Sequence, residues 1–241
     1  MVEARKPNHI QLHCTGIDWK CTGSSVVASY GRLDINGWCN YPGAVCIWNI
    51  FQSAFNPAIP DIIYDHTSCL MCVKCHPLMP SIVAAGSYNG EIVVYDTSLT
   101  TGVSGPLYVT SIDSEYSHKE AVTSLEWQWD NTVATKDSAN GTYVLVSTSS
   151  DGTVLFWSLG NQLKHPIRGK LLILSLTMGL IPYPTHLLGS GIFTSEKGNR
   201  RQYPFTHGVR CLSFASGSAT LTSSNAMTRS QWLVIGQEGT L

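Results

Sequence analysis

The chain has 241 residues and a formal net charge of -1, with 43% hydrophobic and only 13% charged residues. Disordered chains combine low hydrophobicity with high net charge, so this composition excludes extended disorder. The 15 basic residues against 16 acidic ones give no overall field that would attract nucleic acid or an anionic membrane. The 7 Trp and 21 Gly residues are typical of a β protein in which short strands alternate with tight turns.

No targeting or membrane segment stands out along the chain. Residues 1–13 contain no apolar stretch of signal-peptide length, so we expect a lead-in followed by one domain over 14–241. The longest apolar run, Leu171–Ile181, is shorter than the ~20 residues of a membrane helix and is interrupted by polar residues and glycine. We predict a buried strand or a short core segment there, and neither membrane insertion nor nucleic-acid binding.

The cysteines offer one candidate metal site. The 8 cysteines are Cys14, Cys21, Cys39, Cys46, Cys69, Cys72, Cys75 and Cys211, and without a secretory signal we interpret them as reduced thiols. The Cys69-x-x-Cys72-x-x-Cys75 spacing, followed by His76, is one that metal sites use. However, no glycine forms a knuckle between these cysteines, and on a strand Cys72 would face the opposite side. We favour packing of an apolar strand over metal binding, and we expect no cofactor.

Three strands are predicted at the start of the chain. Ile17–Trp19 and Ser25–Gly31 are short segments of branched, small and aromatic residues. After a long polar loop, Arg32–Gly43, a third segment, Ala44–Asn49, ends on Trp48 and Asn49. The order strand, strand, loop and strand ending on an aromatic residue is the first copy of a pattern that recurs.

The second copy replaces the long loop with a tight turn. Cys72–Pro77 leads into Ser81–Gly86. The pair Asn89–Gly90 then precedes a branched strand that ends on Tyr95 and Asp96. Asn-Gly favours a two-residue type I′ hairpin turn, which needs positive φ at both central residues.

The third copy is the most regular. Val122–Trp127 leads into Thr142–Ser147, and the pair Asp151–Gly152 predicts the same type I′ turn. The strand that follows ends on Trp157. A small-residue strand, a glycine turn and a branched strand ending on an aromatic residue therefore occur in the same order as before.

The spacing of these copies predicts the fold. Trp48, Tyr95 and Trp157 lie 47 and 62 residues apart, and a fourth copy spans Val209–Phe214 and Trp232–Gly239. A repeat of ~40–45 residues with four strands is typical of a β-propeller blade, whose faces are buried only by stacking against neighbouring blades.

We therefore predict an all-β, WD-type β-propeller that is incomplete, with three blades and most of a fourth. The expected repeats are residues 14–50, 69–97, 118–159 and 207–241, with a long irregular insertion over 162–205. A β-sandwich with coincidental hairpins is the alternative fold.

A resemblance to WD repeats assigns roles to particular residues. The string Asp151-Gly-Thr-Val-Leu-Phe-Trp157 resembles the WD signature, and His118 lies where such repeats place the His of a Gly-His pair. The resemblance implies a hydrogen-bonded structural set of His118, Ser147 or Ser149, Asp151 and Trp157. The further structural positions are Gly152, Asn89, Gly90, Tyr95, Asp96 and Trp48. A His, Ser and Asp set also suits a hydrolase, but no Gly-x-Ser-x-Gly elbow accompanies it, so we predict no catalytic residue.

A wider resemblance covers most of the chain. The segments Cys14–Asp34, Ala44–Asn49 and Cys75–Asp96 are similar to the opening blades of dynein intermediate chains, most of all to those of cytoplasmic dynein 2. Ser117–Val122 resembles the entry to the third blade of that family, and the likeness returns at Val209–Gly239.

The resemblance implies a non-catalytic scaffold subunit of the dynein-2 motor, which binds the heavy chain through a propeller of typically seven blades. It also implies partners among the other intermediate and light chains, although we expect the N-terminal extension that binds light chains to be absent here. The implied role is retrograde intraflagellar transport and cilium assembly. The implied location is the cytoplasm, the cytoskeleton, and the cilium and its base. A WD adaptor of another complex, such as an axonemal dynein, is the alternative.

Aromatic residues in the predicted loops are the candidate partner contacts. Trp38 and Tyr41 lie in the loop 32–43, and a second long loop covers 99–116. Aromatic residues anchor many protein interfaces, although in the alternative interpretation these side chains fold back on the blade.

Overall fold

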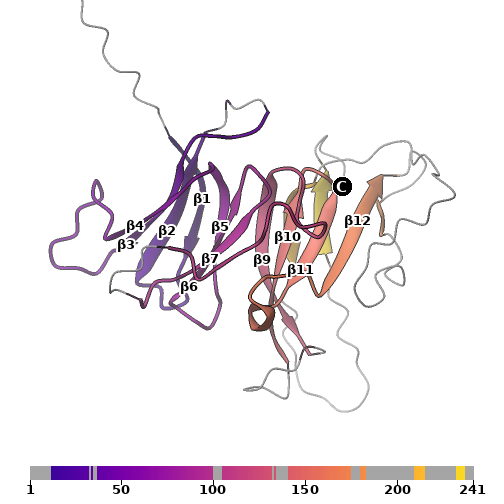
Figure 1. Cartoon of the computed structure of the whole chain (residues 1–241). Coiled ribbons are helices and arrows are strands. Elements are labelled where there is room, and N and C mark those ends of the chain that lie inside the picture. Colours follow the sequence, from indigo (N-terminus) through magenta and orange to yellow (C-terminus); the bar gives the residue numbers. More distant parts are fainter. Residues whose placement is uncertain are drawn as a thin grey trace, which may run out of the picture.

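The described part of the chain is all β, apart from one 3₁₀ turn, η1 (Leu159–Asn161) (Figure 1). The structure is a computed structural model that describes residues 12–32, 34, 37–99, 105–131, 133, 141–174, 180–182, 209–214 and 232–236, with side chains described up to residue 169. Within these residues, no helix has the length and apolar character needed to cross a bilayer.

The described residues form four antiparallel sheets that follow one another along the chain, with neighbouring strands in sequence order. Sheet 1 contains β1 (His13–Trp19), β2 (Ser25–Gly31), β3 (Gly43–Asn49) and β4 (Ile62–His66). Sheet 2 contains β5 (Leu70–Cys75), β6 (Ile82–Ser87), β7 (Ile92–Asp96) and β8 (Tyr108–Val109). Sheet 3 contains β9 (Val122–Asp130), β10 (Thr142–Ser149), β11 (Thr153–Trp157), β12 (Arg168–Leu174) and β13 (Leu180–Pro182). Sheet 4 is the pair β14 (Val209–Phe214) and β15 (Trp232–Gly236).

The sheets stand side by side in a series, as Figure 1 shows from the indigo sheet 1 to the orange sheet 3. The first strands of successive sheets are neighbours, because β5 packs against β1, β9 packs against β5, and β14 packs against β9. This is the arrangement of propeller blades around an axis. The predicted partial WD-type propeller is therefore confirmed, and the β-sandwich alternative is wrong.

Two hydrophobic cores lie between the sheets. The core between sheets 1 and 2 contains Val27, Val45, Ile47, Tyr64, Leu70, Val73, Cys75, Val83, Ala85, Val93 and Tyr95. The core between sheets 2 and 3 contains Ile82, Ala84, Ile92, Val94, Val122, Leu125, Trp127, Leu145, Leu155, Trp157 and Leu163. Alternate residues of a strand point to opposite faces, so β6 and β7 supply side chains to both cores. Sheet 2 is consequently buried on both faces.

The hairpin turns after β6 and β10 differ from the prediction. Gly90 and Gly152 have φ of 86° and 83°, but neither Asn89 nor Asp151 is among the described residues with positive φ. The N–H of Gly90 donates to the carbonyl of Ser87 at 3.3 Å, and the second turn has the same bond at 3.1 Å. These are three-residue loops in which a type I turn is followed by a left-handed glycine. The predicted two-residue type I′ turns are wrong, because the extra residue leaves only the glycine in need of positive φ.

The three strand-end aromatic residues occupy equivalent positions in the sheets. In the strand pairing, Trp48, Tyr95 and Trp157 lie opposite Val26, Val83 and Leu145. Tyr95 is buried in the core against sheet 1, and Trp157 is buried in the core against sheet 2. Trp48 faces the equivalent side of sheet 1, which no described sheet covers.

This uncovered face of sheet 1 is apolar. Ile17 lies opposite Ala28, and Trp19 lies opposite Val26, which in turn pairs with Trp48, so their side chains share one face. Ile17 and Trp19 are 64% and 51% exposed. The face equivalent to the two that are buried therefore remains open to solvent in the structure.

The first three predicted repeats are shorter than the observed sheets. The ranges 14–50, 69–97 and 118–159 each hold the first three strands of a sheet, and the fourth strands lie after them. The predicted insertion 162–205 includes β12 and β13, while its residues 175–179 and 183–205 lie outside the described residues. The fourth repeat, 207–241, is described only in β14 and β15, and the lead-in 1–13 only from residue 12.

Candidate functional site

The side chains predicted to act together meet in sheet 3. The indole N–H of Trp157 donates to Ser147 Oγ at 2.8 Å, and Ser147 Oγ lies 2.6 Å from His118 Nε2. On the other side of the imidazole, His118 Nδ1 lies 2.7 Å from Thr153 Oγ1. The Thr153 hydroxyl donates to Asp151 Oδ1 at 2.6 Å. A continuous hydrogen-bonded network therefore runs from the indole to the carboxylate.

One consistent set of bond directions runs between the two ends of this network. The Trp157 indole has only a donor, and an ionised Asp151 carboxylate has only acceptors. In this set Ser147 accepts from Trp157 and donates to Nε2 of His118, with the carbonyl of Leu155 at 3.4 Å as a second acceptor for its hydroxyl. Thr153 accepts from Nδ1 of His118 and donates to Asp151. Every group is satisfied when His118 is neutral and carries its proton on Nδ1, a tautomer assigned from these partners.

Asp151 also holds the segment that leads into β9. Its Oδ2 accepts the backbone N–H of Lys119 at 2.8 Å, and its Oδ1 accepts the N–H of Thr153 at 2.8 Å. Burial raises the pKa of this carboxyl, but the nearby His118 ring and the hydrogen bonds from Thr153 and Lys119 outweigh burial and hold the pKa well below its usual value. The carboxylate is therefore charged at neutral pH, and it ties the β10–β11 turn to the start of the sheet.

The network is inaccessible to a substrate. Ser147 and His118 are 0% and 1% exposed. Ser149, the other serine left open by the sequence, accepts the N–H of Asp151 at 3.2 Å and donates to the carbonyl of Glu120 at 3.1 Å. It lies at the edge of the network, so Ser147 is the hydroxyl that bridges the indole and the imidazole. The arrangement joins strands and is unsuited to nucleophilic attack.

Sheets 1 and 2 have alanine where sheet 3 has this serine. Ala28 and Ala85 occupy the register position of Ser147, two residues beyond the partner of the strand-end aromatic residue. The indole N–H of Trp48 and the hydroxyl of Tyr95 are both buried and make no hydrogen bond to any described residue. The missing hydroxyl accounts for the unpartnered indole N–H of Trp48, because the alanine methyl of Ala28 offers no acceptor.

The turn after β6 joins sheet 2 to both of its neighbours. The side chain of Asn89 pairs with the backbone of Cys39, accepting its N–H at 3.0 Å and donating to its carbonyl at 2.8 Å. At Gly90 a Cβ would lie 2.4 Å from the carbonyl oxygen of His118, and φ is +86°. Only glycine fits this position, because the turn presses against the segment that carries the network histidine.

The remaining predicted positions lie at a turn and a strand end. Gly152 closes the loop between β10 and β11 with a φ of 83°. Asp96 accepts the N–H and the hydroxyl of Ser98 at 2.9 and 2.6 Å, and the bonds from Ser98 hold the pKa of Asp96 below its usual value. Asp96 is thus part of a local turn and lies outside the network.

The comparison with known families agrees with this geometry. The family model described as "WD domain, G-beta repeat" matches residues 109–158, a segment that spans β9, β10 and β11 and contains the whole network. This segment is a WD40 repeat.

Proteins similar to this WD40 chain are dynein intermediate chains. Cytoplasmic dynein 2 intermediate chain 2 of Mus musculus is 33% identical over 146 residues, which cover 61% of this chain and 26% of the relative. The Homo sapiens protein of the same name is 32% identical over 146 residues, with the same coverage. Dynein axonemal intermediate chain 1 of Bos taurus is 31% identical over 144 residues, 59% of this chain and 19% of the relative.

The WD40 chain thus spans about a quarter of the length of the dynein-2 relatives that it matches. The resemblance to dynein intermediate chains that the sequence predicts is confirmed by these matches.

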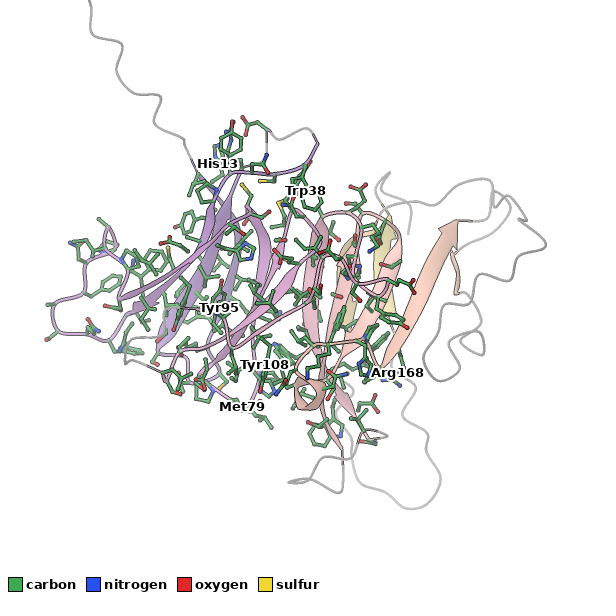
Figure 2. All side chains as sticks on the ribbon, viewed as in Figure 1. His13, Trp38, Met79, Tyr95, Tyr108 and Arg168 are labelled. Atoms are coloured by element: carbon green, nitrogen blue, oxygen red, sulfur yellow. The ribbon has the colours of Figure 1, made fainter. Side chains whose placement is uncertain are left out.

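The WD40 chain presents its two predicted partner contacts in the loop between β2 and β3. Trp38 is 57% exposed and Tyr41 is also exposed. The Arg32 guanidinium lies 4.2 Å from the centroid of the Tyr41 ring and forms two hydrogen bonds to Asp34, at 2.9 and 2.6 Å. Trp38 lies at the end of the molecule opposite Met79 (Figure 2). A partner contact at Trp38 and Tyr41 stays a prediction.

The clustered cysteines pack within the sheets of the WD40 chain. Cys75 belongs to the core between sheets 1 and 2, whereas Cys72 packs against the core between sheets 2 and 3. Burial raises the pKa of both thiols to about 12, so both are protonated at neutral pH. Among the described residues, no group of three or more His, Cys, Asp and Glu side chains is placed to hold a metal ion.

Thr153 has a role in the WD40 repeat that the sequence patterns did not single out. Its hydroxyl stands between His118 and Asp151, which are themselves 3.8 Å apart at Nδ1 and Oδ2. A hydroxyl residue two positions after the turn aspartate was the available signal, since such a side chain reaches back to the carboxylate.

His76 is the second residue whose role in the fold the sequence patterns did not reveal. Sequence spacing suggested a fourth metal ligand, but its Nδ1 accepts the N–H groups of Leu78 and Met79 at 3.1 and 2.9 Å. Its ring lies 4.6 Å from that of Trp127. Burial lowers the pKa of His76 to about 4, so at neutral pH the ring is uncharged and free to accept. His76 therefore shapes the β5–β6 turn.

Proposed function

We propose that this chain is a non-catalytic scaffold subunit of the dynein-2 motor, which binds the motor heavy chain and serves retrograde intraflagellar transport and cilium assembly. The observation that carries the proposal is the 33% and 32% identity to two cytoplasmic dynein 2 intermediate chains over 146 residues. The proposed partners are the heavy chain and the other intermediate and light chains of the motor. The proposed location is the cytoplasm, the cytoskeleton, and the cilium and its base.

The geometry of the WD40 repeat supports a binding role. Its His118 and Ser147 side chains are buried and hydrogen-bonded to each other, and Thr153 links the imidazole to Asp151, so this network stabilises the blade and holds its serine away from solvent. The connections between the strands lie at the two ends of the sheets, where rigid strands position them for contact with other proteins. The arrangement suits a scaffold, which needs a stable framework and accessible loops.

The experiment is affinity purification of the tagged chain from ciliated cells, with the bound heavy chains identified by mass spectrometry. Recovery of a dynein-2 heavy chain is the expected result. A role in an axonemal dynein is the second candidate, because the bovine axonemal relative reaches 31% identity over 144 residues. Recovery of axonemal heavy chains alone would favour that candidate, and recovery of no dynein heavy chain would contradict both.

A further inference from the structure

Six exposed large apolar side chains gather at one end of sheets 1 and 2. They lie on the connection 50–61 between β3 and β4, on 76–81 between β5 and β6, and at Leu99 after β7. Phe51, Ile59 and Leu78 are 74%, 65% and 66% exposed, and Phe55, Met79 and Leu99 are exposed as well. Figure 2 places Met79 at the end of the molecule opposite Trp38 and His13. We call this group of connections the apolar loop surface.

Backbone hydrogen bonds and one lysine join these connections into a continuous surface. The N–H of Ile50 donates to the carbonyl of Ser24 in the β1–β2 turn at 3.0 Å. Lys20, at the other side of that turn, donates to Thr97 Oγ1 at 2.7 Å. The N–H of Thr97 then donates to the carbonyl of Ser81 at 2.8 Å. The three connections are therefore held beside one another by the turn between β1 and β2.

Asp61, at the end of the β3–β4 connection, is the one charged residue in the apolar loop surface as defined by its described residues. None of the residues 50–60, 76–81 or 97–99 is Asp, Glu, Lys or Arg, although charged residues make up 13% of the chain. Exposed apolar residues scattered singly are ordinary, but several on adjoining uncharged loops are the composition of an interface centre. This end of the molecule is thus suited to being covered by a partner.

The backbone turns that carry this surface are held in place before any partner binds. In the β5–β6 turn, His76 accepts the N–H groups of Leu78 and Met79. In the β3–β4 connection, Asn49 Oδ1 accepts the N–H of Phe51 at 3.1 Å. In the next turn, Asn56 Oδ1 accepts the N–H of Ala58 at 3.0 Å. Turns fixed in this way reduce the entropy that binding would otherwise cost.

The surrounding charges indicate the chemistry of the partner. Asp61 and Asp96 lie at the bases of the connections and outnumber the one nearby cation, Lys20, whose ammonium group donates to Thr97 Oγ1. Peripheral membrane binding through apolar residues draws on basic residues that attract anionic headgroups, which this acidic rim would repel. A protein face with an apolar centre and Lys or Arg at its rim complements both the loops and the two aspartates.

We propose that the apolar loop surface is where this chain docks onto such an apolar, basic-rimmed protein face. The inference rests on the proposed function, in which that face belongs to the dynein heavy chain. It places the main contact at the end opposite Trp38 and Tyr41, the residues that the sequence suggested.

The test compares the tagged full chain with two variants in the heavy-chain purification. One variant carries Phe51→Asp and Leu78→Asp, and the control carries Ile63→Asp, an exposed apolar residue on β4 that lies outside the apolar loop surface. We expect the double variant to recover about tenfold less heavy chain, as loss of a hot spot does, and the control to recover nearly as much as the unmodified chain. Unchanged melting temperatures show that both variants are folded.

Each other outcome overturns the inference in a distinguishable way. Full heavy-chain recovery by the folded double variant, or equal loss in both variants, overturns the inference and leaves the proposed function standing. No recovery by the unmodified chain overturns the proposed function and the inference together. Flotation with phosphatidylcholine and phosphatidylserine vesicles, lost in the double variant only, would show that the surface binds a membrane and contradict a protein partner.

Discussion

Replacing Ser147 with alanine removes the one atom to which both Trp157 and His118 are hydrogen-bonded. The substitution leaves the indole N–H and the imidazole Nε2 buried without a partner. A buried polar group that loses its partner costs about 1–3 kcal/mol, so we expect Ser147→Ala to lower the free energy of unfolding by about 2–4 kcal/mol. In a domain of this size 1 kcal/mol corresponds to about 2–4 °C, so the melting temperature should fall by about 5–15 °C.

Scanning calorimetry on the purified full chain measures this effect, and Ser149→Ala is the matched control. Ser149 is equally buried and on the same strand, but its hydroxyl bonds only to backbone groups at the edge of the network, so we expect a loss of about 1 kcal/mol. Trp157→Phe should also lower the free energy of unfolding by less when Ser147 is already alanine, because the indole N–H then has no hydrogen bond left to be removed. A melting temperature of Ser147→Ala equal to that of the unmodified chain would refute the reasoning.

Three further predictions follow from the other sheets. Ala28→Ser should raise the free energy of unfolding by about 1 kcal/mol, because the new hydroxyl can accept the buried indole N–H of Trp48; a lower melting temperature would count against this. Burial in the folded chain lowers the pKa of His76 from its ordinary value of 6.5 to about 4, so as the pH falls the unfolded chain takes up this proton before the folded chain does. The free energy of unfolding should therefore fall by about 3 kcal/mol as the pH drops from about 6.5 to 4. The slope of stability against pH in that window should be shallower for His76→Ala, and an unchanged slope would contradict the assignment. The open face of sheet 1 should drive concentration-dependent association, which Ile17→Ser with Trp19→Ser should weaken in sedimentation velocity; an unmodified chain that is monomeric at every concentration would exclude it.

The blade pattern was predictable because its strongest signals are local. Trp48, Tyr95 and Trp157 each end a branched strand, and their spacing is visible without any tertiary information. The turn type was not predictable in the same way, because Asn-Gly and Asp-Gly pairs suit both a two-residue type I′ turn and a three-residue loop with a left-handed glycine. The outer strands gave little signal, since β8 has only two residues and pairs with a neighbour on one side.

The candidate site was predictable in its members but not in its bonding. His118, Asp151 and Trp157 follow from the resemblance to WD repeats, but Ser147 and Ser149 lie on the same face of one strand and only the register of β10 with β11 selects Ser147. Thr153 joins the network through a three-dimensional contact that spacing alone does not reveal.

The apolar loop surface was beyond reach of the sequence for a different reason. Phe51 and Leu78 look like ordinary hydrophobic residues in the chain, and only the folded structure shows that they are exposed at the same end of the sheets. Membership of a surface depends on which loops the topology brings together, and this is a property of the whole fold.

Under the proposed function this chain is a stable component of the dynein-2 motor. Density-gradient sedimentation of extracts from ciliated cells tests this proposal most directly, with the chain and the dynein-2 heavy chain detected in every fraction. We expect the chain to migrate in the same fractions as the heavy chain and to shift to slow fractions when the heavy chain is depleted. A chain that sediments slowly and apart from the heavy chain, in cells that contain both, would contradict it.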